Sequence, residues 1–99
     1  MEIDVSKLST QPSVKVERLY VTVYLTERPD QVGFKGFAKS VSSYERQGRF
    51  DILPLHENFV TEFVKELIIV AESGESVSYP VKRGVLEVAS NVVRVFLKT

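Results

Sequence analysis

Apolar and polar residues alternate strictly over residues 19–25. Every second side chain there is branched and apolar, and the positions between hold Tyr or Thr; the apolar residues are Leu19, Val21, Val23 and Leu25. A period of two made from β-branched and aromatic residues predicts a strand. Residues 34–45 alternate more weakly and predict a second strand. A short third strand is predicted over 49–53, and it ends there because Pro54 lacks the N–H that a ladder needs.

Residues 58–71 fit two patterns. Three apolar residues recur at helical spacing: Phe59, Phe63 and Leu67. Asn58 suits a helix N-cap and Gly74 suits a helix end. Periodicity alone therefore leaves a helix and a strand equally open over this segment.

The C-terminal third is strand-like in three pieces. They cover 76–82, 85–89 and 92–98, with Gly84 and the Ser-Asn pair at 90–91 as turns between them. Many short strands with turn residues between them predict an all-β fold, an antiparallel sandwich or a flattened barrel.

The first 16 residues differ from the rest of the chain. They mix Ser, Thr, Gln, Pro and charged residues with isolated apolar ones. Such a segment buries too little surface to offset the entropy of ordering. We expect a flexible arm over 1–16 and one globular domain over 17–99.

Composition narrows the classes of function. Thirteen Lys and Arg balance thirteen Asp and Glu, so no net charge attracts a polyanion, and nucleic acid is not an expected partner. The chain has no Cys, which excludes thiolate nucleophiles, disulfides and Cys-based metal sites and fits a reducing, cytoplasmic setting. The longest apolar run covers 67–71, far below the roughly 20 residues of a membrane span. The acidic, polar N-terminus does not resemble a signal peptide.

Catalytic chemistry has little to build on. His56 is the only histidine, and a nucleophilic triad needs a Ser, Thr or Cys beside a base that a third group orients. Asp51 and Glu57 are near in sequence, but on a strand and a tight loop they need not converge. One histidine with scattered carboxylates falls short of a metal site, and isolated glycines do not cradle a phosphate. We expect no catalytic site, metal, cofactor or small-molecule substrate. A small enzyme that uses His56 remains an alternative hypothesis.

Three blocks of the sequence carry a family resemblance. They read "FKGFAKSVSS" (34–43), "GRFDILPLHENFVT" (48–61) and "YPVKRGVLEVASNVVRVFL" (79–97). In this order they resemble the N-terminal domain of the epsilon subunit of F-type ATP synthase, called delta in mitochondria, over roughly residues 19–98. The resemblance implies a flattened two-sheet antiparallel β-sandwich of short strands. It also implies that 59–72 is two strands with a break near Val64-Lys65-Glu66, not a helix.

The resemblance implies a non-catalytic rotor subunit. In the family, the sandwich sits at the foot of the central stalk, packs on the gamma subunit and the c-ring, and couples ring rotation to gamma in proton-driven ATP synthesis. The complex would hold this chain at the cytoplasmic face of the membrane. The residues that match or adjoin the family's contact positions are Gln47, Arg49, Pro54, Leu55, His56, Phe59 and Thr61. His56 is equally compatible with a contact and with a solvated or capping role.

Three features depart from the family pattern. Leu55 stands where the family usually has a small residue, often Gly, so it is either an exposed apolar anchor or a residue that reshapes the turn. Arg49 stands where an acidic residue is common, which predicts a c-ring loop of different charge or a different contact. The chain ends at Thr99, right after the sandwich, so the family's C-terminal helical hairpin is not expected. These departures leave open a stand-alone β-sandwich module that serves another partner.

Overall fold

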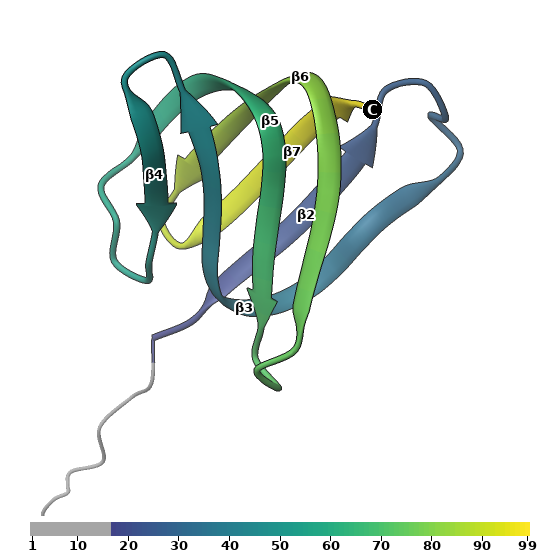
Figure 1. The fold of residues 1–99 in the computed structure, drawn as a ribbon. Helices are drawn as coiled ribbons and strands as arrows, with labels where there is room; N and C mark the ends of the chain where they lie inside the picture. Colours follow the sequence, from purple (N-terminus) through teal and green to yellow (C-terminus); the bar gives the residue numbers. More distant parts are fainter. Residues whose placement is uncertain (1–16) are drawn as a thin grey trace, which may run out of the picture.

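The computed structural model describes residues 17–99, and these residues form six strands (Figure 1). The strands are β2 (Leu19–Leu25), β3 (Val32–Glu45), β4 (Gly48–Ile52), β5 (Phe59–Ala71), β6 (Ser76–Ala89) and β7 (Val92–Lys98). The arm expected over 1–16 lies outside the described residues. Over the described part of the chain, no helix is long and apolar enough to cross a membrane.

The strands close into a flattened barrel. Their order is β2-β7-β6-β5-β3-β4, and an additional pairing of β2 with β3 closes the ring. The long strand β3 makes this closure, because its first half pairs with β2 and its second half pairs with β4 and β5. In Figure 1, β4, β3, β5 and β6 form one layer, and β2 and β7 cross behind it. Within residues 17–99, β4 pairs with β3 alone.

The core lies between the two layers. Every second side chain of β2 and β7 points into it, as period-two strands with one buried face require. These side chains are Leu19, Val21, Val23, Val93, Val95 and Leu97, each at most 1% exposed. The other layer contributes Val41, Ile52, Phe63, Leu67 and Ile69. The expected all-β sandwich is confirmed, with one difference: β2 and β7 pair in parallel, where we expected antiparallel pairs alone.

Residues 59–71 form one strand, β5, so the helical alternative is wrong. A spacing of four is a multiple of two as well as about one helical turn, so Phe59, Phe63 and Leu67 share one face of a strand. The expected break into two strands is also wrong. In its place, β5 has an irregularity at Lys65, whose φ is 75°. Near this residue the pairing of β5 with β6, and its pairing with β3, each shift register.

The expected turn at Gly84 is wrong as well, because β6 continues without interruption from Ser76 to Ala89. Gly84 lies inside β6 and pairs with Phe63 on one side and Leu97 on the other. The register between β5 and β6 shifts just before it, where Lys82 and Arg83 are both exposed. This bulge adds one residue to β6, so the inward-facing positions shift by one beyond it. In the sequence, such a shift looks like the end of one strand and the start of another.

Candidate functional site

The seven predicted contact residues lie along the side of the molecule that β4 and the following loop form. Gln47 lies in the turn before β4, and Pro54 and Leu55 lie in the loop after it. A five-residue strand spans about 17 Å, so the structure separates these residues into two groups. Aromatic contacts connect the groups, since the Phe59 ring lies 6.2 Å from Phe50 and 4.9 Å from His56, measured between centroids.

The first group surrounds the β3–β4 turn. The Thr61 hydroxyl donates a hydrogen bond to Glu45 Oε2 at 3.0 Å. Gln47 and Thr61 line the same shallow hollow, which Val60 also lines. Val60 is 65% exposed. This end of the molecule therefore combines amide, hydroxyl and carboxylate groups and the guanidinium of Arg46 with one exposed apolar side chain.

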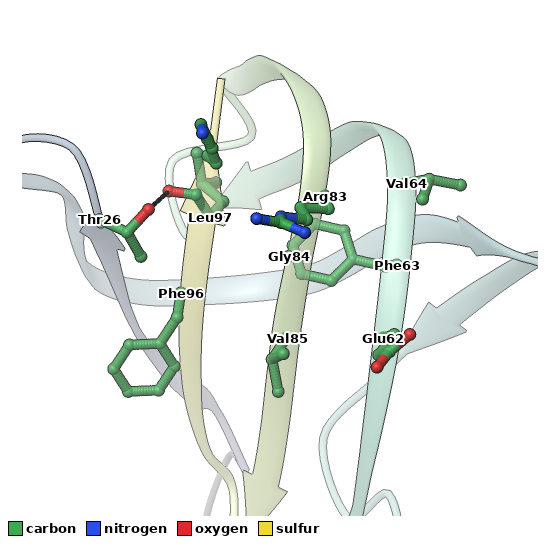
Figure 2. Close-up of a pocket in the computed structure, with 10 residues that line it drawn as sticks. Thr26, Glu62, Phe63, Val64, Arg83, Gly84, Val85, Phe96 and Leu97 are labelled. Atoms are coloured by element: carbon green, nitrogen blue, oxygen red, sulfur yellow. Dashed lines mark hydrogen bonds between the residues drawn. The ribbon is translucent and has the colours of Figure 1, made fainter.

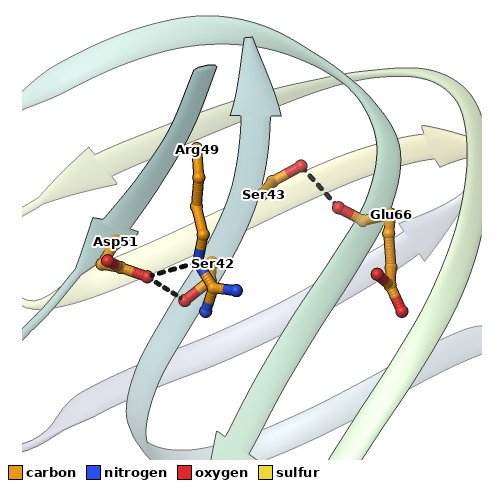
Figure 3. A network of polar contacts seen from close by, with 5 residues as sticks. All are labelled: Ser42, Ser43, Arg49, Asp51 and Glu66. Carbon is orange, nitrogen blue, oxygen red and sulfur yellow. Dashed lines mark hydrogen bonds and ion pairs between the residues drawn. The ribbon is translucent and has the colours of Figure 1, made fainter.

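Arg49 lies beside this turn, but its charge is already paired (Figure 3). Its Nε donates to Asp51 Oδ1 at 3.2 Å, and the Ser42 hydroxyl donates to the same oxygen at 2.5 Å. The Ser42 hydrogen bond, followed by that of Arg49, lowers the pKa of Asp51. The same carboxylate raises the pKa of Arg49. The cation that departs from the family pattern thus forms part of a local ion pair.

The second group is the loop of residues 53–58. Leu55 is 73% exposed, so it is not a core residue. Its φ is 70°, a left-handed conformation that costs a leucine about 1–2 kcal/mol and suits glycine. The chain thus holds a leucine in a conformation that glycine would adopt without strain. His56 is half-buried, and its Nδ1 lies 2.8 Å from the Glu57 carbonyl oxygen.

A surface that the sequence pattern does not single out covers the outer face of β2, β6 and β7. The register places the outward side chains in rows that cross the strands. One row is largely apolar, and it runs Glu62, Val85, Phe96, Tyr24 and Val32. The next row is polar except for Val60, and it runs Val60, Glu87, Arg94, Thr22 and Lys35, with an ion pair between Arg94 and Glu87 at 3.1 Å. A third row is again apolar, and it runs Ala89, Val92, Tyr20 and Phe37. We call these three rows the aromatic face.

The apolar rows of the aromatic face are ordered by ring contacts. Tyr24 and Phe96 stack with centroids 5.0 Å apart, and Tyr20 meets Phe37 edge-on at 5.1 Å. The Arg18 guanidinium lies 3.8 Å from the Phe37 centroid and pairs with Glu72 at 3.0 Å. Phe37, Val85 and Phe96 are each about 40% exposed. Contiguous exposed apolar residues on a soluble domain mark interaction sites. The sequence does carry a signal for this surface, because β2 and β7 have large apolar residues at outward as well as inward positions.

A hollow of about 420 Å³ opens at one end of the aromatic face (Figure 2). Val64, Val85 and Phe96 line it together with the basic residues Arg83 and Lys98. The Thr26 hydroxyl, at its rim, donates to the Leu97 carbonyl at 3.2 Å. The hollow holds no nucleophile beside a base. Over residues 17–99, His, Asp and Glu side chains form no group of three or more that suits a metal ion.

The sequence as a whole matches one protein family. Residues 20–99 fit the model of the ATP synthase delta/epsilon chain, β-sandwich domain. The chain belongs to this family. No curated protein sequence matches it.

Two solved structures with the same fold belong to ATP synthases. One comes from the mitochondrial ATP synthase of Euglena gracilis (OSCP/F1/c-ring, rotational state 1), with a TM-score of 0.71 and 22% identity, over 95% of this chain and 59% of that one. Another comes from the central stalk/c-ring of the Tetrahymena thermophila enzyme, with a TM-score of 0.66 and 12% identity, over 87% of this chain and 67% of that one. The chain thus spans 59% of the Euglena chain.

Proposed function

We propose that this chain is a non-catalytic rotor subunit of an F-type ATP synthase, which couples rotation of the c-ring to the gamma subunit. The observation that carries the proposal is the match of residues 20–99 to the delta/epsilon family. The Tetrahymena structure, described as a central stalk and c-ring assembly, is consistent with it. The complex would hold the chain at the cytoplasmic face of the membrane, with gamma and the c-ring as its partners.

Each partner is assigned to a different part of the surface. The aromatic face and Leu55 would contact gamma, because they carry the exposed apolar residues that the core of an interface requires. His56 follows Leu55 in the loop, its ring lies 4.9 Å from that of Phe59, and both residues would belong to the same contact. The β3–β4 turn, with Gln47 and Thr61, would meet the polar loops of the c-ring. Arg49 is paired with Asp51, and Glu45, Arg46 and Glu62 line the hollow beside Gln47, so this end presents a hydrogen-bonding surface with charges of both signs.

Copurification tests the proposal directly. A tagged copy of the full chain, expressed in its source cells, should bring down gamma, the catalytic subunits and the c-ring. Membranes that lack the chain should hydrolyse ATP with weaker proton pumping, and added chain should restore the pumping. A monodisperse monomer that never associates with gamma would contradict the proposal, as would membranes that pump normally without the chain.

A further inference from the structure

Two asparagines connect the 53–58 loop to the β6–β7 turn. Asn91 Oδ1 accepts a hydrogen bond from the Leu55 backbone N–H at 2.7 Å. In the opposite direction, Asn58 Oδ1 accepts one from the Ser90 backbone N–H at 3.0 Å. Each segment therefore supplies a side-chain acceptor for the backbone of the other. We call this pair of hydrogen bonds the asparagine clasp.

The clasp holds the one strained residue of the loop. Leu55 is left-handed, with φ 70°, and a leucine leaves this region unless its surroundings fix it. Inside the loop, the His56 backbone N–H donates a hydrogen bond to the Leu53 carbonyl at 3.1 Å, and the His56 ring contacts the Glu57 carbonyl. The bond to Asn91 is the contact that fixes the Leu55 amide from outside the loop.

Asn91 is itself fixed by two further bonds. Its carbonyl accepts from the Tyr20 N–H at 2.8 Å, and its Nδ2 donates to Glu17 Oε1 at 3.0 Å. Its φ of 66° is one that asparagine tolerates. Asn91 therefore connects the start of β2, the β6–β7 turn and the exposed loop through its backbone and its side chain. The neighbouring residue, Val92, belongs to the aromatic face, so the clasp joins Leu55 to the rest of the surface assigned to gamma.

We propose that Asn91 and Asn58 are positioning residues for the gamma contact: they hold the loop in the conformation that presents Leu55 to an apolar pocket of gamma. The inference rests on the proposed function. Its physical basis is preorganisation, because a loop that is ordered before binding loses little conformational entropy when the complex forms. The clasp also accounts for a leucine at a backbone position that favours glycine.

The first test uses the free chain and does not depend on gamma. Asn91→Gly removes the side chain and still allows the positive φ of the turn. We expect hydrogen exchange of the Leu55 amide, followed by NMR, to become at least about tenfold faster, because its acceptor is gone. Ser90→Gly is the matched control, since it keeps the backbone N–H that Asn58 accepts from, and it should leave the exchange unchanged. Unchanged exchange in Asn91→Gly would overturn the clasp.

The second test is a double-mutant cycle with the gamma subunit. Asn91→Gly should weaken binding by about two- to tenfold, the cost of ordering one or two side chains. In a Leu55→Gly background the same change should have no effect, because neither the anchor nor its strain is present. Equal weakening in both backgrounds would show that Asn91 acts elsewhere and would overturn the inference.

The same cycle separates the inference from the proposed function. If Leu55→Gly binds gamma as tightly as the original chain, the assignment of Leu55 to gamma fails. If Leu55→Gly weakens binding and Asn91→Gly does not, only the clasp fails. Asn58→Ala repeats the test from the other side, where we expect a smaller loss of affinity. If both asparagine variants fail to fold, the clasp is a folding element, and the positioning role is overturned.

Discussion

At the scale of single residues, Leu55 is the most exposed large apolar side chain of residues 17–99, at 73%. We predict that Leu55→Asp weakens binding to gamma by about 1–3 kcal/mol, because a carboxylate in an apolar contact loses its hydration without gaining a partner. The melting temperature should not fall, since aspartate tolerates a positive φ better than leucine. Calorimetric titration against gamma measures the effect. Leu55→Met, which keeps an apolar side chain of similar volume, should bind normally; a folded Leu55→Asp variant with unchanged affinity would remove Leu55 from the interface.

Gly84 has a packing role that can be tested by stability alone. A Cβ there would lie 2.6 Å from Cε1 of Phe63 and 2.9 Å from the Phe96 carbonyl oxygen. The Phe63 ring packs on the Gly84 backbone (Figure 2), so Gly84→Ala forces that ring or the strand to move. We expect a loss of about 1–3 kcal/mol in the free energy of unfolding, measured in urea. Phe63→Leu should offset part of the loss when the two changes are combined, and a Gly84→Ala variant as stable as the original chain would contradict the packing argument.

The Asp51 network predicts a pH dependence. The hydrogen bond from Ser42 and the charge of Arg49 lower the pKa of Asp51 in the folded chain. A lowered pKa contributes stability above the unfolded value of about 3.9, and this contribution is lost as the pH falls through the folded value. Asp51→Asn should therefore be less stable than the original chain at pH 7, and the difference should shrink below about pH 4. A difference that stays constant from pH 7 to pH 3 would show that the carboxylate charge does not matter.

At the scale of elements, β6 is one strand in which the inward-facing positions change at a bulge. Its first half turns Val77, Tyr79 and Val81 inward, and its second half turns Leu86 and Val88 inward, so odd positions give way to even ones. The bulge at Lys82 and Arg83 makes this change possible. We predict that deletion of Lys82 unfolds the chain or lowers its melting temperature strongly, because one half would then face solvent with its apolar side chains. Lys82→Ala should be neutral by circular dichroism, and a deletion variant that melts normally would mean that the strand can slip.

The parts of the fold that alternation predicted are the ones in which alternation is unbroken. β7 follows the period of two from end to end, and β2 departs from it at Thr22, which is buried; Pro54 ends β4 as a missing N–H requires. A bulge and a turn look alike in a sequence, so the pattern predicts a turn at Gly84 where β6 is in fact continuous. Long-range contacts leave no local pattern: the bonds from Leu55 to Asn91 and from Ser90 to Asn58 span 36 and 32 residues. The seven contact residues came from a family resemblance, and their roles remain predictions.

At the scale of the whole molecule, the two outer faces of the barrel differ in chemistry. The aromatic face exposes Val85 and Phe96, whereas the opposite face, which we call the serine face, sets the half-buried Ile68 and Val70 among polar residues. These polar residues are Ser42, Ser76, Ser78, Asp51 and Glu66. A subunit held between partners needs one apolar surface for a lasting contact, and the opposite face needs only to remain hydrated.

Strand β6 allows a matched test of this difference, because its bulge turns its two halves toward opposite outer faces. We predict that Val85→Lys weakens gamma binding about tenfold or more, since removing water from the ammonium group beside Phe96 costs more than an ion pair with Glu62 on β5 returns. Ser76→Lys adds the same charge to the same strand on the serine face and should leave the affinity unchanged. Both variants should keep the melting temperature of the original chain, as exposed substitutions usually do. If Ser76→Lys is the variant that loses affinity, gamma binds the serine face, and the assignment of the two faces must be reversed.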